Sequence, residues 1–386
     1  MTQHNTDVVV IGGGYAGVMA ANRLAPHANV TLVNPRPAFV ERIRLHQLVA
    51  GNDDAVADYA AVLAGSVRLV VDGAERIDAA TRTVTLSSGD RLRYDYLIYA
   101  VGSTGTVPAA VPGAAEFSYP IGELEQAQRL ATRLADVPVS APLVVVGGGL
   151  TGIEAATEFA EAGRPVTLVT DVLGPSLADS GRRSIAKRLR KLAVTVIEGS
   201  AVAEVRADGV VLGDGREVAA AVTVWTAGFG VPGLAAASGL STDRLGRLLT
   251  DETLTSISDP RILGAGDAVS PSDAPWRMSC QAALPLGAQA ANTVLARLAG
   301  EDPAAVNHAM AGQCISLGRK AGTFQFANVD DTPRRWYIGG RTGALVKEQV
   351  CRYTLKWMRG EADKPGSYTW KKNPRRGQVA VAMPVR

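Results

Sequence analysis

The sequence predicts an α/β fold made of two similar units, each a parallel β-sheet with helices packed against it. One observation is the apolar, β-branched run Asp7–Ile11, which leads into the glycine-rich stretch Gly12–Gly17 and then into a helical pattern. Such a run is typical of a buried parallel strand. The other observation is that the same order of strand, glycines and helix returns at Leu143–Ala156. We therefore expect two domains of one architecture.

The first glycine-rich stretch has the G-x-G-x-x-G spacing of a Rossmann-like dinucleotide-binding turn, with Gly12, Gly14 and Gly17. The first glycine allows a sharp turn, the second lets the backbone approach a pyrophosphate, and the third lets the helix pack closely on the strand. Tyr15 and Ala16 begin that helix, whose N-terminal N–H groups point toward the phosphates. A glycine-rich turn without a ligand is the alternative explanation.

The second unit repeats the spacing with Gly147, Gly149 and Gly152. This recurrence weakens the ligand-free alternative. Two dinucleotide folds in one chain indicate two dinucleotides. We expect a tightly held FAD and an exchangeable NAD(P)H, with NAD(P)H on the second unit.

The composition of the 386 residues argues against several other classes of protein. The net charge of +3 gives no reason to expect nucleic acid binding. The cysteines Cys280, Cys314 and Cys351 lie far apart without a C-x-x-C pair, so we expect no redox disulfide and no metal site, and each should be a small buried hydrophobic residue. The sequence shows no signal peptide and no apolar run that could span a bilayer. We expect a cytoplasmic protein or one on a membrane surface.

The second strand of each unit ends where a dinucleotide fold usually carries an acidic residue for the ribose. In the first unit this residue is Asn34, which can still exchange hydrogen bonds with a ribose hydroxyl. In the second unit it is Thr170, followed by Asp171. The missing carboxylate weakens repulsion of the 2′-phosphate of NADPH, and Asp171 restores part of that repulsion. We expect NADH or NADPH, with a lean to NADH.

Small residues end later strands of both units. Ala100 and Gly102 end one strand, and Gly228 follows the corresponding strand of the second unit. Small residues at these points let the chain pass close to a cofactor. A further apolar strand ends in Gly266 and Asp267, whose carboxylate can accept a hydrogen bond from a ribityl hydroxyl of FAD. A helix N-cap at Asp267 is compatible with that role.

Two further segments contain candidate flavin contacts. Arg42 is a candidate partner for the phosphates or the isoalloxazine edge, and a solvated surface arginine is the equally good alternative. Gln281 and Ala282 begin a helix of small residues, whose N-terminus would face the flavin pyrimidine. His46 is interpreted as a packed loop histidine rather than a catalytic base.

Short alternating strands at 67–92 predict a β-meander inserted in the first unit, and a similar set occurs at 194–224. A segment with proline and glycine at 108–120 marks a domain boundary. We expect an FAD-binding domain in two parts, an NAD(P)H-binding domain and a smaller C-terminal region. These are 1–110 and 236–312 for the FAD-binding parts, 111–235 for the NAD(P)H-binding domain, and 313–386 for the C-terminal region.

The motif order GGGYAG, GGGLTGIE, WTAGFG and LGAGD, with the Ala-x-Gly strand end at 100–102, resembles the flavoproteins with two dinucleotide-binding domains. Within these, the chain is similar to type II NADH:quinone oxidoreductases. It is more similar to their short relatives of the ferroptosis-suppressor and apoptosis-inducing-factor-like group. The resemblance covers roughly residues 7–360. It implies a C-terminal part that shapes a quinone site and meets the membrane.

The resemblance implies roles for two residues. Glu154 matches the family's glutamate beside the nicotinamide and the flavin, and a helix-surface glutamate is the alternative. Lys347 resembles the family's lysine near the flavin and the quinone carbonyl. Type II enzymes carry Ala-Gln-x-Ala-x-Gln beside the quinone, whereas here Cys280 and Pro285 replace the first Ala and the second Gln. This departure leaves the natural acceptor open.

The C-terminal residues 334–376 contain twelve Lys or Arg and three Asp or Glu, with aromatic residues between them. Val346, Val350, Tyr353 and Trp357 lie at helical spacing. Basic and aromatic residues on an amphipathic helix suit an anionic membrane surface. In the alternative, the aromatic stripe packs on the protein and the charges are solvated.

The expected function is that of an FAD-dependent oxidoreductase, which takes hydride from NAD(P)H and passes electrons to a quinone or similar small acceptor. Glu154 would orient the nicotinamide or relay a proton, and Lys347 would stabilise negative charge. One alternative is a flavin oxidase or dehydrogenase that tailors a small organic substrate. Another is a slow redox-sensing flavoprotein. A homodimer is left open.

Overall fold

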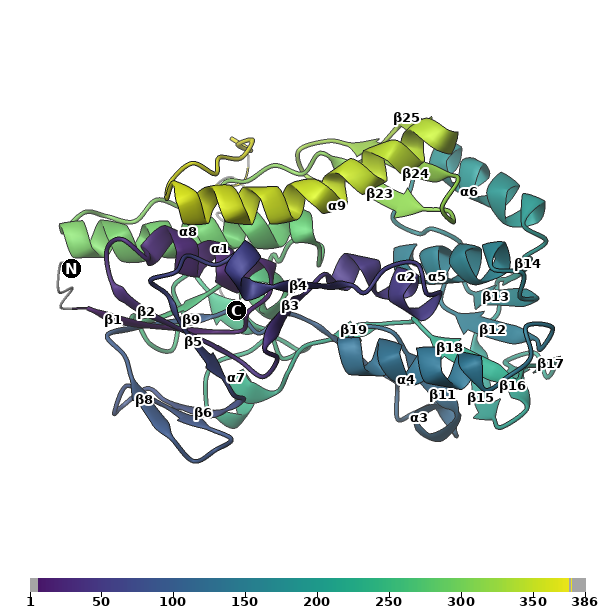
Figure 1. Cartoon of the computed structure of the whole chain (residues 1–386), viewed down its shortest axis with the longest axis horizontal. Helices are drawn as coiled ribbons and strands as arrows, with labels where there is room; N and C mark the ends of the chain where they lie inside the picture. Colours follow the sequence, from purple (N-terminus) through teal and green to yellow (C-terminus); the bar gives the residue numbers. More distant parts are fainter. Residues whose placement is uncertain (1–5, 375, 377–386) are drawn as a thin grey trace.

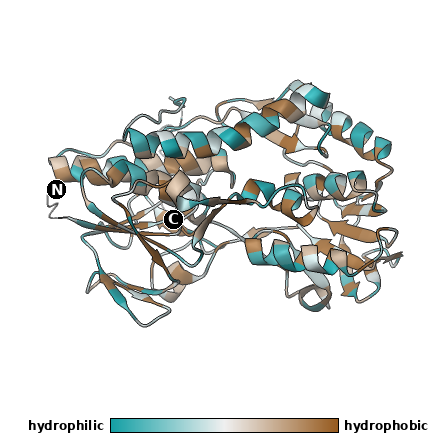
Figure 2. Ribbon diagram, viewed as in Figure 1, coloured by the Kyte–Doolittle hydropathy of each residue, from teal (hydrophilic) through white to brown (hydrophobic). Residues whose placement is uncertain are grey.

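The structure is a computed structural model that describes residues 6–374 and 376. Two α/β units lie side by side along its long axis, and helix α9 (Gly340–Asp363) runs across both of them (Figure 1). Figure 2 shows hydrophobic residues concentrated in the strands of both units, whereas the helices around them carry hydrophobic and hydrophilic residues. The described helices include none that is both long and apolar enough to cross a membrane.

The first unit is a five-stranded parallel sheet. In spatial order its strands are β21 (Ile262–Gly264), β9 (Tyr96–Tyr99), β1 (Asp7–Ile11), β2 (Asn29–Asn34) and β5 (Arg68–Val71). The edge strand β21 comes from late in the sequence and pairs with β9. Helices α1 (Tyr15–Leu24) and α8 (Cys280–Ala299) pack against each other above this sheet (Figure 1).

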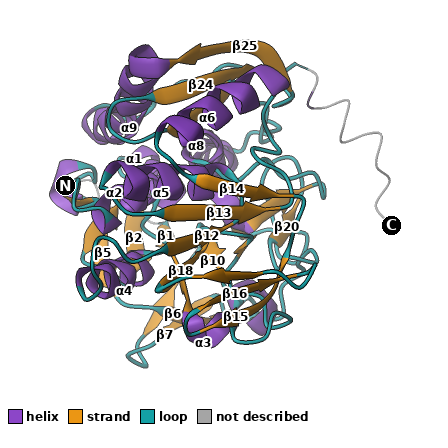
Figure 3. Cartoon of the chain, turned by 90° about the vertical axis from the view of Figure 1, so that its right-hand side faces the viewer, coloured by secondary structure: helices purple, strands orange, loops and turns teal. Residues whose placement is uncertain are grey.

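The second unit repeats this arrangement with the same order of equivalent strands. Its parallel strands are β11 (Ser118–Pro120), β18 (Val222–Trp225), β12 (Leu143–Val146), β13 (Val166–Thr170) and β14 (Thr195–Glu198). Its helices are α4 (Leu124–Ala135), α5 (Leu150–Glu161) and α6 (Asp179–Lys191). Figure 3 shows this sheet side-on, with α6 and α9 above it. The predicted fold class is confirmed.

An antiparallel meander is inserted in each sheet, between β5 and β9 in the first unit and between β14 and β18 in the second. The meanders consist of β6 (Ala74–Asp78), β7 (Thr83–Leu86) and β8 (Arg91–Arg93), and of β15 (Val202–Arg206), β16 (Gly209–Leu212) and β17 (Glu217–Ala219). The prediction that the run after residue 67 belongs to the first meander is wrong, because β5 pairs in parallel with β2. Likewise, β14 pairs in parallel with β13. A short apolar run does not reveal its pairing partner, which is why the sequence grouped these strands wrongly.

Helix α1 is buried along its whole length because α8 crosses it at very close range. A Cβ atom on Gly287 of α8 would lie 2.1 Å from the carbonyl oxygen of Ala16. Any side chain at Gly287 would therefore push α8 away from the first glycine-rich turn. The contact fixes where the N-terminus of α8 points.

The C-terminal region is a three-stranded antiparallel sheet followed by α9. The strands are β23 (Gly312–Ser316), β24 (Gly322–Ala327) and β25 (Pro333–Gly339). Helix α9 contacts α1 of the first unit as well as β23 and β24. Its buried face carries Lys347, Cys351, Thr354 and Met358. This helix thus brings side chains to the junction of the two units.

The remaining elements are short and lie in the connections. They are β3 (Ala38–Val40), the 3-10 turn Arg42–Arg44, α2 (Leu45–Val49), β4 (Val56–Asp58), the 3-10 turn Tyr59–Ala61, β10 (Thr104–Gly105), α3 (Ala114–Phe117), β19 (Phe229–Gly230), α7 (Leu234–Ala237), β20 (Leu248–Thr250), the 3-10 turn Gly266–Ala268 and β22 (Val269–Pro271).

Candidate functional site

A cavity of about 1110 Å³ lies at the junction of the two units. It is lined by residues 11–16 of the first glycine-rich turn, by residues 150, 151 and 154 at the start of α5, by the first residues of α8 and by the inner face of α9. Pockets for single drug-sized ligands measure about 300–1000 Å³. The cavity is large enough for more than one small ring system.

The first glycine-rich turn has the tight geometry that its spacing predicts. Gly12 has a φ of +104°, and a Cβ there would lie 2.3 Å from the carbonyl oxygen of Ala100. A Cβ on Gly17 would lie 1.8 Å from the carbonyl oxygen of Gly12. Around Gly14, in contrast, the described chain has no atom within 4 Å of a Cβ position. The middle glycine therefore presents free space to a ligand.

The second turn reproduces this pattern. Gly147 has a φ of +113° and packs against Thr226 and Ala227, and a Cβ on Gly152 would lie 1.9 Å from the carbonyl oxygen of Gly147. Gly149 is open in the same way as its counterpart in the first turn, within the described chain. The two turns are thus two cradles of equal geometry. One side of each is closed by the residues just after the neighbouring strand, which is β9 in the first unit and β18 in the second.

The strand-end residues Asn34 and Thr170 occupy equivalent places in the two cradles. The Asn34 side chain accepts a hydrogen bond from the N–H of Gly13 (3.0 Å) and donates one to the carbonyl of Arg36 (2.8 Å). The Thr170 hydroxyl accepts from the N–H of Gly148 (2.9 Å) and donates to the carbonyl of Val172 (3.0 Å). Both side chains therefore brace the glycine loop.

The Thr170 hydroxyl has no proton left to donate to a ribose, because it already donates that proton to the carbonyl of Val172. The Asn34 amide keeps one free donor and one free acceptor site within the bonds just given. Asp171 is exposed next to Thr170. It is the carboxylate nearest in sequence to the second ribose position.

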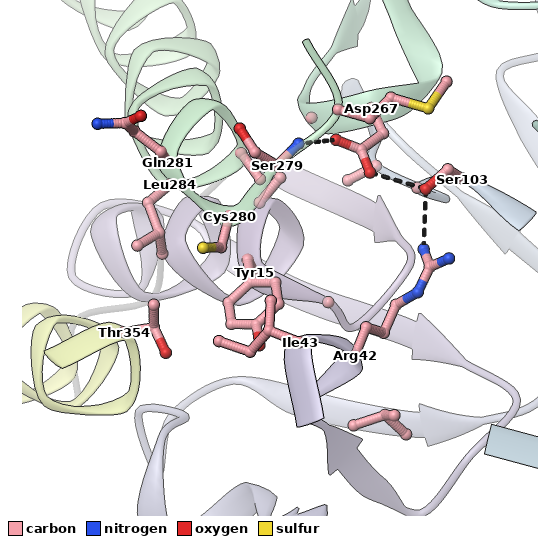
Figure 4. Close-up of a pocket in the computed structure, with 18 of the residues that line it drawn as sticks. Tyr15, Arg42, Ile43, Ser103, Asp267, Ser279, Cys280, Gln281, Leu284 and Thr354 are labelled. Carbon is pink, nitrogen blue, oxygen red and sulfur yellow. Dashed lines mark hydrogen bonds between the residues drawn. The ribbon is translucent and has the colours of Figure 1, made fainter. Parts of the chain in front are cut away.

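A hydrogen-bonded chain links the first unit to the start of α8 (Figure 4). Arg42 donates to the carbonyl of Gly122 (2.7 and 3.0 Å) and to the hydroxyl of Ser103 (3.1 Å), and Ser103 donates to Asp267 (2.8 Å). The other oxygen of Asp267 accepts from the N–H of Ser279 (3.1 Å). Arg42 is half-buried and lines the cavity, so the solvated-surface alternative is wrong.

Of the remaining predicted cofactor contacts, six residues line the cavity, whereas Ala282 and Gly228 do not. The residues that line the cavity are Tyr15, Ala16, Ala100, Gly102, Gly266 and Gln281. The Gln281 amide, oriented so that its nitrogen donates, bonds the carbonyl of Gly312 (3.0 Å) and accepts from the N–H of Ala311 (3.1 Å). Ala282 is buried and its N–H bonds the Ser279 side chain (3.3 Å). Gly228 is exposed at a positive φ of +91° and does not line the cavity.

A buried charged cluster forms one wall of the cavity, and both residues with roles implied by the resemblance belong to it. The Lys347 ammonium lies 2.9 Å from Oε1 of Glu154, and the N–H of Ser316 donates to the same carboxylate (2.9 Å). His46 Nδ1 lies 3.8 Å from Oε2 of Glu154. The helix-surface alternative for Glu154 is wrong, because this side chain is buried.

The charges of this cluster are fixed by their mutual contacts. Burial opposes ionisation of Glu154, but the Lys347 ammonium, His46 and the Ser316 N–H together hold the pKa of Glu154 below its ordinary value. Burial also opposes charge on Lys347, but the Glu154 carboxylate raises the pKa of Lys347 well above its ordinary value. Burial lowers the pKa of His46 to about 4. The cluster is therefore an ion pair beside a neutral imidazole.

Two of the three cysteines correct the sequence expectation. Cys351 is buried, as expected, but Cys280 and Cys314 are only half-buried and line the cavity. They come from α8 and β23, which the fold brings to the same wall. Burial raises the pKa of Cys280 to about 12, so this residue is a neutral thiol.

Three residues that the sequence did not mark as cofactor or catalytic contacts belong to the site. One of them, His46, is packed as expected but lies on helix α2 rather than in a loop. Ser103 and Ser279 connect Arg42 and Asp267, and His46 faces Glu154. The sequence gives a weak signal for the serines, since each lies one or two residues from a predicted contact. For His46 the sequence gives no signal, because its partner lies 108 positions away in the chain.

These residues fit a bound FAD and a bound NAD(P)H. The two cradles leave room only at their middle glycines, where a pyrophosphate would approach the backbone. The Asp267 carboxylate keeps acceptor sites beyond the two donors it already has. The start of α5 and the turn at Gly14 line the same cavity, so both ligands would reach it.

Comparison with known proteins gives the same picture. Residues 6–287 match the family described as pyridine nucleotide-disulphide oxidoreductase. An NADH dehydrogenase-like protein of Mycobacterium tuberculosis is 32% identical over 324 residues, which cover 75% of this chain and 80% of that protein. An alternative NAD(P)H-ubiquinone oxidoreductase of Arabidopsis thaliana is 26% identical over 341 residues, covering 74% of this chain and 64% of that protein.

Among solved structures, the sulfide:quinone oxidoreductase of Aquifex aeolicus has a similar fold. It matches with a TM-score of 0.77 at 22% identity, and the match covers 92% of each chain. The match extends past the two α/β units into the C-terminal region, since those units alone make up a smaller share of the chain.

Proposed function

Because the chain belongs to the pyridine nucleotide-disulphide oxidoreductase family, whose cofactors are FAD and NAD(P)H, we propose that it passes electrons from NAD(P)H through FAD to a quinone-like small acceptor. The observation that carries the proposal is the single cavity that is lined both by the first cradle and by the start of α5, the helix that follows the second cradle. Hydride transfer requires the reacting atoms to approach within about 3–3.5 Å. A cavity lined by residues of both units supports the proposal, because both rings could enter the same space.

FAD, when bound, supplies the chemistry of accepting hydride and passing electrons on. The residues of the chain bind and orient the two ligands. The N–H groups of the two cradles would hold the pyrophosphates, and Asp267, fixed by Ser103 and Ser279, would accept from a ribityl hydroxyl. Arg42 fixes Ser103 and so acts on Asp267 indirectly.

At the charged cluster, the Lys347 ammonium would stabilise negative charge that develops on the reduced ring or on the acceptor. Its charge is secured by Glu154, which raises the pKa of Lys347. Glu154 in turn would face the nicotinamide, because it lies on α5 directly after the second cradle. The pair is thus suited to the point where the two rings meet.

The acceptor would enter from the aromatic side of the cavity. Trp357, Tyr368 and Trp370 line it, with ring centroids 5.8 Å apart for the first pair and 6.2 Å for the second. Leu284 and Thr354 also line the cavity (Figure 4). A flat apolar ring such as a quinone suits a wall of this kind, and the plant relative is named as an NAD(P)H-ubiquinone oxidoreductase.

The polar contact to a quinone carbonyl would come from Lys347. Gln281 already bonds backbone groups, and Pro285 stands where the type II motif has its second glutamine. The nucleotide would be NADH in preference to NADPH, because exposed Asp171 adjoins the second ribose position and would repel a 2′-phosphate.

We also propose that β25 and the outer face of α9 contact an anionic membrane surface. Trp336 and Leu345 are 63% and 65% exposed, and Tyr353 and Trp357 are each 42% exposed. Arg335 stacks over the Trp336 ring at 4.9 Å. The inner part of the predicted stripe, at Val346 and Val350, is half-buried, so only the outer part of the stripe is available to a membrane.

The membrane proposal is tested by sedimentation with vesicles of phosphatidylglycerol and, as the uncharged control, phosphatidylcholine. We expect binding to the anionic vesicles only, weakened by salt and by the double substitution Trp336→Ser and Leu345→Ser. Self-association of the unmodified chain in light scattering, lost in that double variant without vesicle binding, would assign the face to a homodimer instead.

The electron-transfer proposal is tested by anaerobic mixing of the FAD-loaded protein with NADH and with NADPH. We expect NADH to bleach the flavin absorbance faster than NADPH, and a short-chain ubiquinone to restore it. A protein that neither nucleotide bleaches would overturn the proposal. Fast recovery with oxygen alone would favour the oxidase alternative, and very slow bleaching would favour a redox sensor.

A further inference from the structure

A second, smaller pocket adjoins the charged cluster. Its volume is about 400 Å³, within the range of sites that hold a single ligand. Lys347 is the lining residue that it shares with the main cavity. The other lining residues come from α2, from the end of β23 and the turn after it, and from the first three turns of α9. The proposed electron transfer gives this side pocket no role.

Two walls of the side pocket are held at a fixed spacing by close backbone contact. A Cβ on Gly343 of α9 would lie 2.2 Å from the carbonyl oxygen of Gly322, the first residue of β24. A Cβ on Gly322 would lie 2.7 Å from the backbone nitrogen of Ala344. Lys320 and Arg341 each lie two residues before one of these glycines. Two separate elements therefore bring two cations to the same pocket.

The side pocket carries more positive than negative charge. Four cations and one carboxylate line it, and three of these five charges are paired with residues elsewhere, namely those of Arg319, Lys347 and Glu348. Lys320 and Arg341 are exposed, and neither forms an ion pair within the described chain. The pocket is thus left with two uncompensated positive charges.

Gln47 adds an uncharged donor to the same pocket. This residue of α2 is 2% exposed, and it lines the side pocket but not the main cavity. Its Oε1 atom accepts a hydrogen bond from Arg44 (3.0 Å), which leaves its Nε2 atom without a partner in the described chain. Nε2 is not one of the fully enclosed unpaired atoms there, so a ligand in the side pocket can reach it. Buried polar groups are nearly always paired, and this one lacks an acceptor.

The free groups of the side pocket call for a ligand with negative charge and several acceptor oxygens. Lysine and arginine side chains only donate hydrogen bonds, and the free Nε2 of Gln47 is a donor as well. A carboxylate holds its two oxygens in one plane, whereas the oxygens of a phosphate group point in tetrahedral directions. Donors that come from three separate elements match the phosphate better. The first turn of α9 contains no acidic residue, so the positive end of its dipole also favours an anion.

The apolar surface beside these donors indicates a lipid as the source of the phosphate. Leu345 lines the side pocket and is 65% exposed. It also belongs to the outer face of α9 that we propose to contact a membrane. The acyl chains of a bound lipid would cover Leu345, which is favourable because it removes apolar surface from water. A free phosphate ion would leave that side chain exposed.

We propose that the side pocket binds the phosphate group of an anionic glycerophospholipid, with Lys320 and Arg341 as the charged contacts and Gln47 as the neutral one. The inference rests on the proposed membrane contact and deepens it, because it gives that contact a specific headgroup site. It does not depend on the electron-transfer proposal.

The test titrates the FAD-loaded protein with dihexanoyl phosphatidylglycerol below its critical micelle concentration, followed by calorimetry. Inorganic phosphate and dihexanoyl phosphatidylcholine are titrated in parallel. We expect the phosphatidylglycerol to bind most tightly. The double substitution Lys320→Gln and Arg341→Gln should lower that affinity at least about tenfold, because it removes two charged hydrogen-bond donors. Gln47→Glu keeps an acceptor for Arg44 but repels the phosphate, and should abolish binding.

The matched control is the double substitution Arg335→Gln and Lys356→Gln. It removes two exposed charges from β25 and α9, and neither residue lines the side pocket. The control should bind the short-chain phosphatidylglycerol as the wild type does. Equal losses in the two double variants would indicate general attraction between charges and would overturn the inference. Inorganic phosphate or phosphatidylcholine that bound as tightly as phosphatidylglycerol would overturn it too, as would a wild-type protein that bound none of them.

Sedimentation with phosphatidylglycerol vesicles separates this inference from the membrane proposal. The variant at Lys320 and Arg341 should bind vesicles more weakly than the control variant. If the wild type sediments and both variants bind alike, the membrane proposal holds and the headgroup site is wrong. If the wild type does not sediment, the membrane proposal fails, and the titration with monomeric lipid still decides the headgroup site. Bleaching by NADH at the wild-type rate checks that both variants are folded.

Discussion

The two glycine-rich cradles share their local geometry but differ in what surrounds them. The first glycines have φ values of +104° and +113°, and the third glycines would each clash with the carbonyl of the first. Around the first cradle, α8 and α9 pack on α1, and every residue of α1 is buried. In the second cradle, Leu150 and Thr151 at the start of α5 are only half-buried.

This difference teaches that the same turn can serve a resident or an exchangeable ligand, depending on what covers it. A ligand on the first cradle would sit beneath the α1–α8 contact, where Gly287 meets Ala16. A ligand on the second cradle would leave past the half-buried first turn of α5. We therefore expect FAD to stay through purification and NAD(P)H to exchange.

The largest expected effect comes from placing valine at the third glycine of each cradle, because the two variants should fail in different ways. Gly17→Val should abolish FAD binding and folding of the first unit, because its Cβ would lie 1.8 Å from the Gly12 carbonyl inside a fully buried helix. Gly152→Val, whose Cβ would lie 1.9 Å from the Gly147 carbonyl, should disrupt the second cradle but leave the first unit and its flavin in place. The protein should therefore stay yellow while bleaching by NADH slows by at least about 100-fold, the cost of roughly 1 Å of misplacement. Flavin content and stopped-flow bleaching measure the two effects.

The matched controls are Gly14→Ala and Gly149→Ala, where a Cβ meets no atom of the described chain within 4 Å. Both should fold normally and weaken only their own nucleotide. If Gly152→Val also lost its FAD, the two cradles would not be independent, and the comparison would fail.

How much of this could be predicted from the sequence depends on the separation of the residues involved. Each cradle consists of one strand, one turn and one helix within about a dozen consecutive residues. The spacing of the glycines was therefore enough to predict the cradle. The strand ends at Ala100 and Gly102 were also predictable, because small residues mark a close approach. The cradle geometry needed no knowledge of the tertiary fold.

The charged cluster could not be predicted in the same way. It joins α2, α5, β23 and α9 through His46, Glu154, Ser316 and Lys347. A resemblance supplied Glu154 and Lys347, but no local pattern links either of them to His46. The sequence left two interpretations of Arg42 open for a related reason. Its hydrogen-bond partner Gly122 lies between β11 and α4 of the second unit, 80 positions away in the chain.

The next effect tests the junction rather than either cradle. Lys347→Met leaves the Glu154 carboxylate buried without its ammonium partner, and should cost about 3–5 kcal/mol of unfolding free energy. Adding Glu154→Gln should recover most of that loss, because the uncompensated charge is removed. Denaturant unfolding measures both variants. A double variant as unstable as the single one would mean that packing, not charge, is what Lys347 provides.

A smaller effect appears in the dependence of stability on pH. The unfolded His46 ring takes up a proton below about pH 6.5, whereas the folded ring does so only near pH 4, since its pKa is lowered to about 4. Its contribution is therefore fully present above pH 6.5 and is lost as pH falls toward 4, by about 3 kcal/mol in total. His46→Gln should flatten the stability curve in this window. Substitution of the exposed His27 by Gln is the matched control.

The smallest effect returns to the two cradles through the residues that brace them. Thr170→Val keeps the shape of the side chain but removes its bonds to Gly148 and Val172, and should weaken NADH binding about fivefold while FAD content stays unchanged. Asn34→Leu should do the reverse, weakening FAD retention while the affinity for NADH in the loaded protein stays unchanged. Titration with NADH and flavin release on dilution measure the two. If either variant weakened the binding of both ligands, each strand-end residue would not act on its own cradle alone, and this prediction would be wrong.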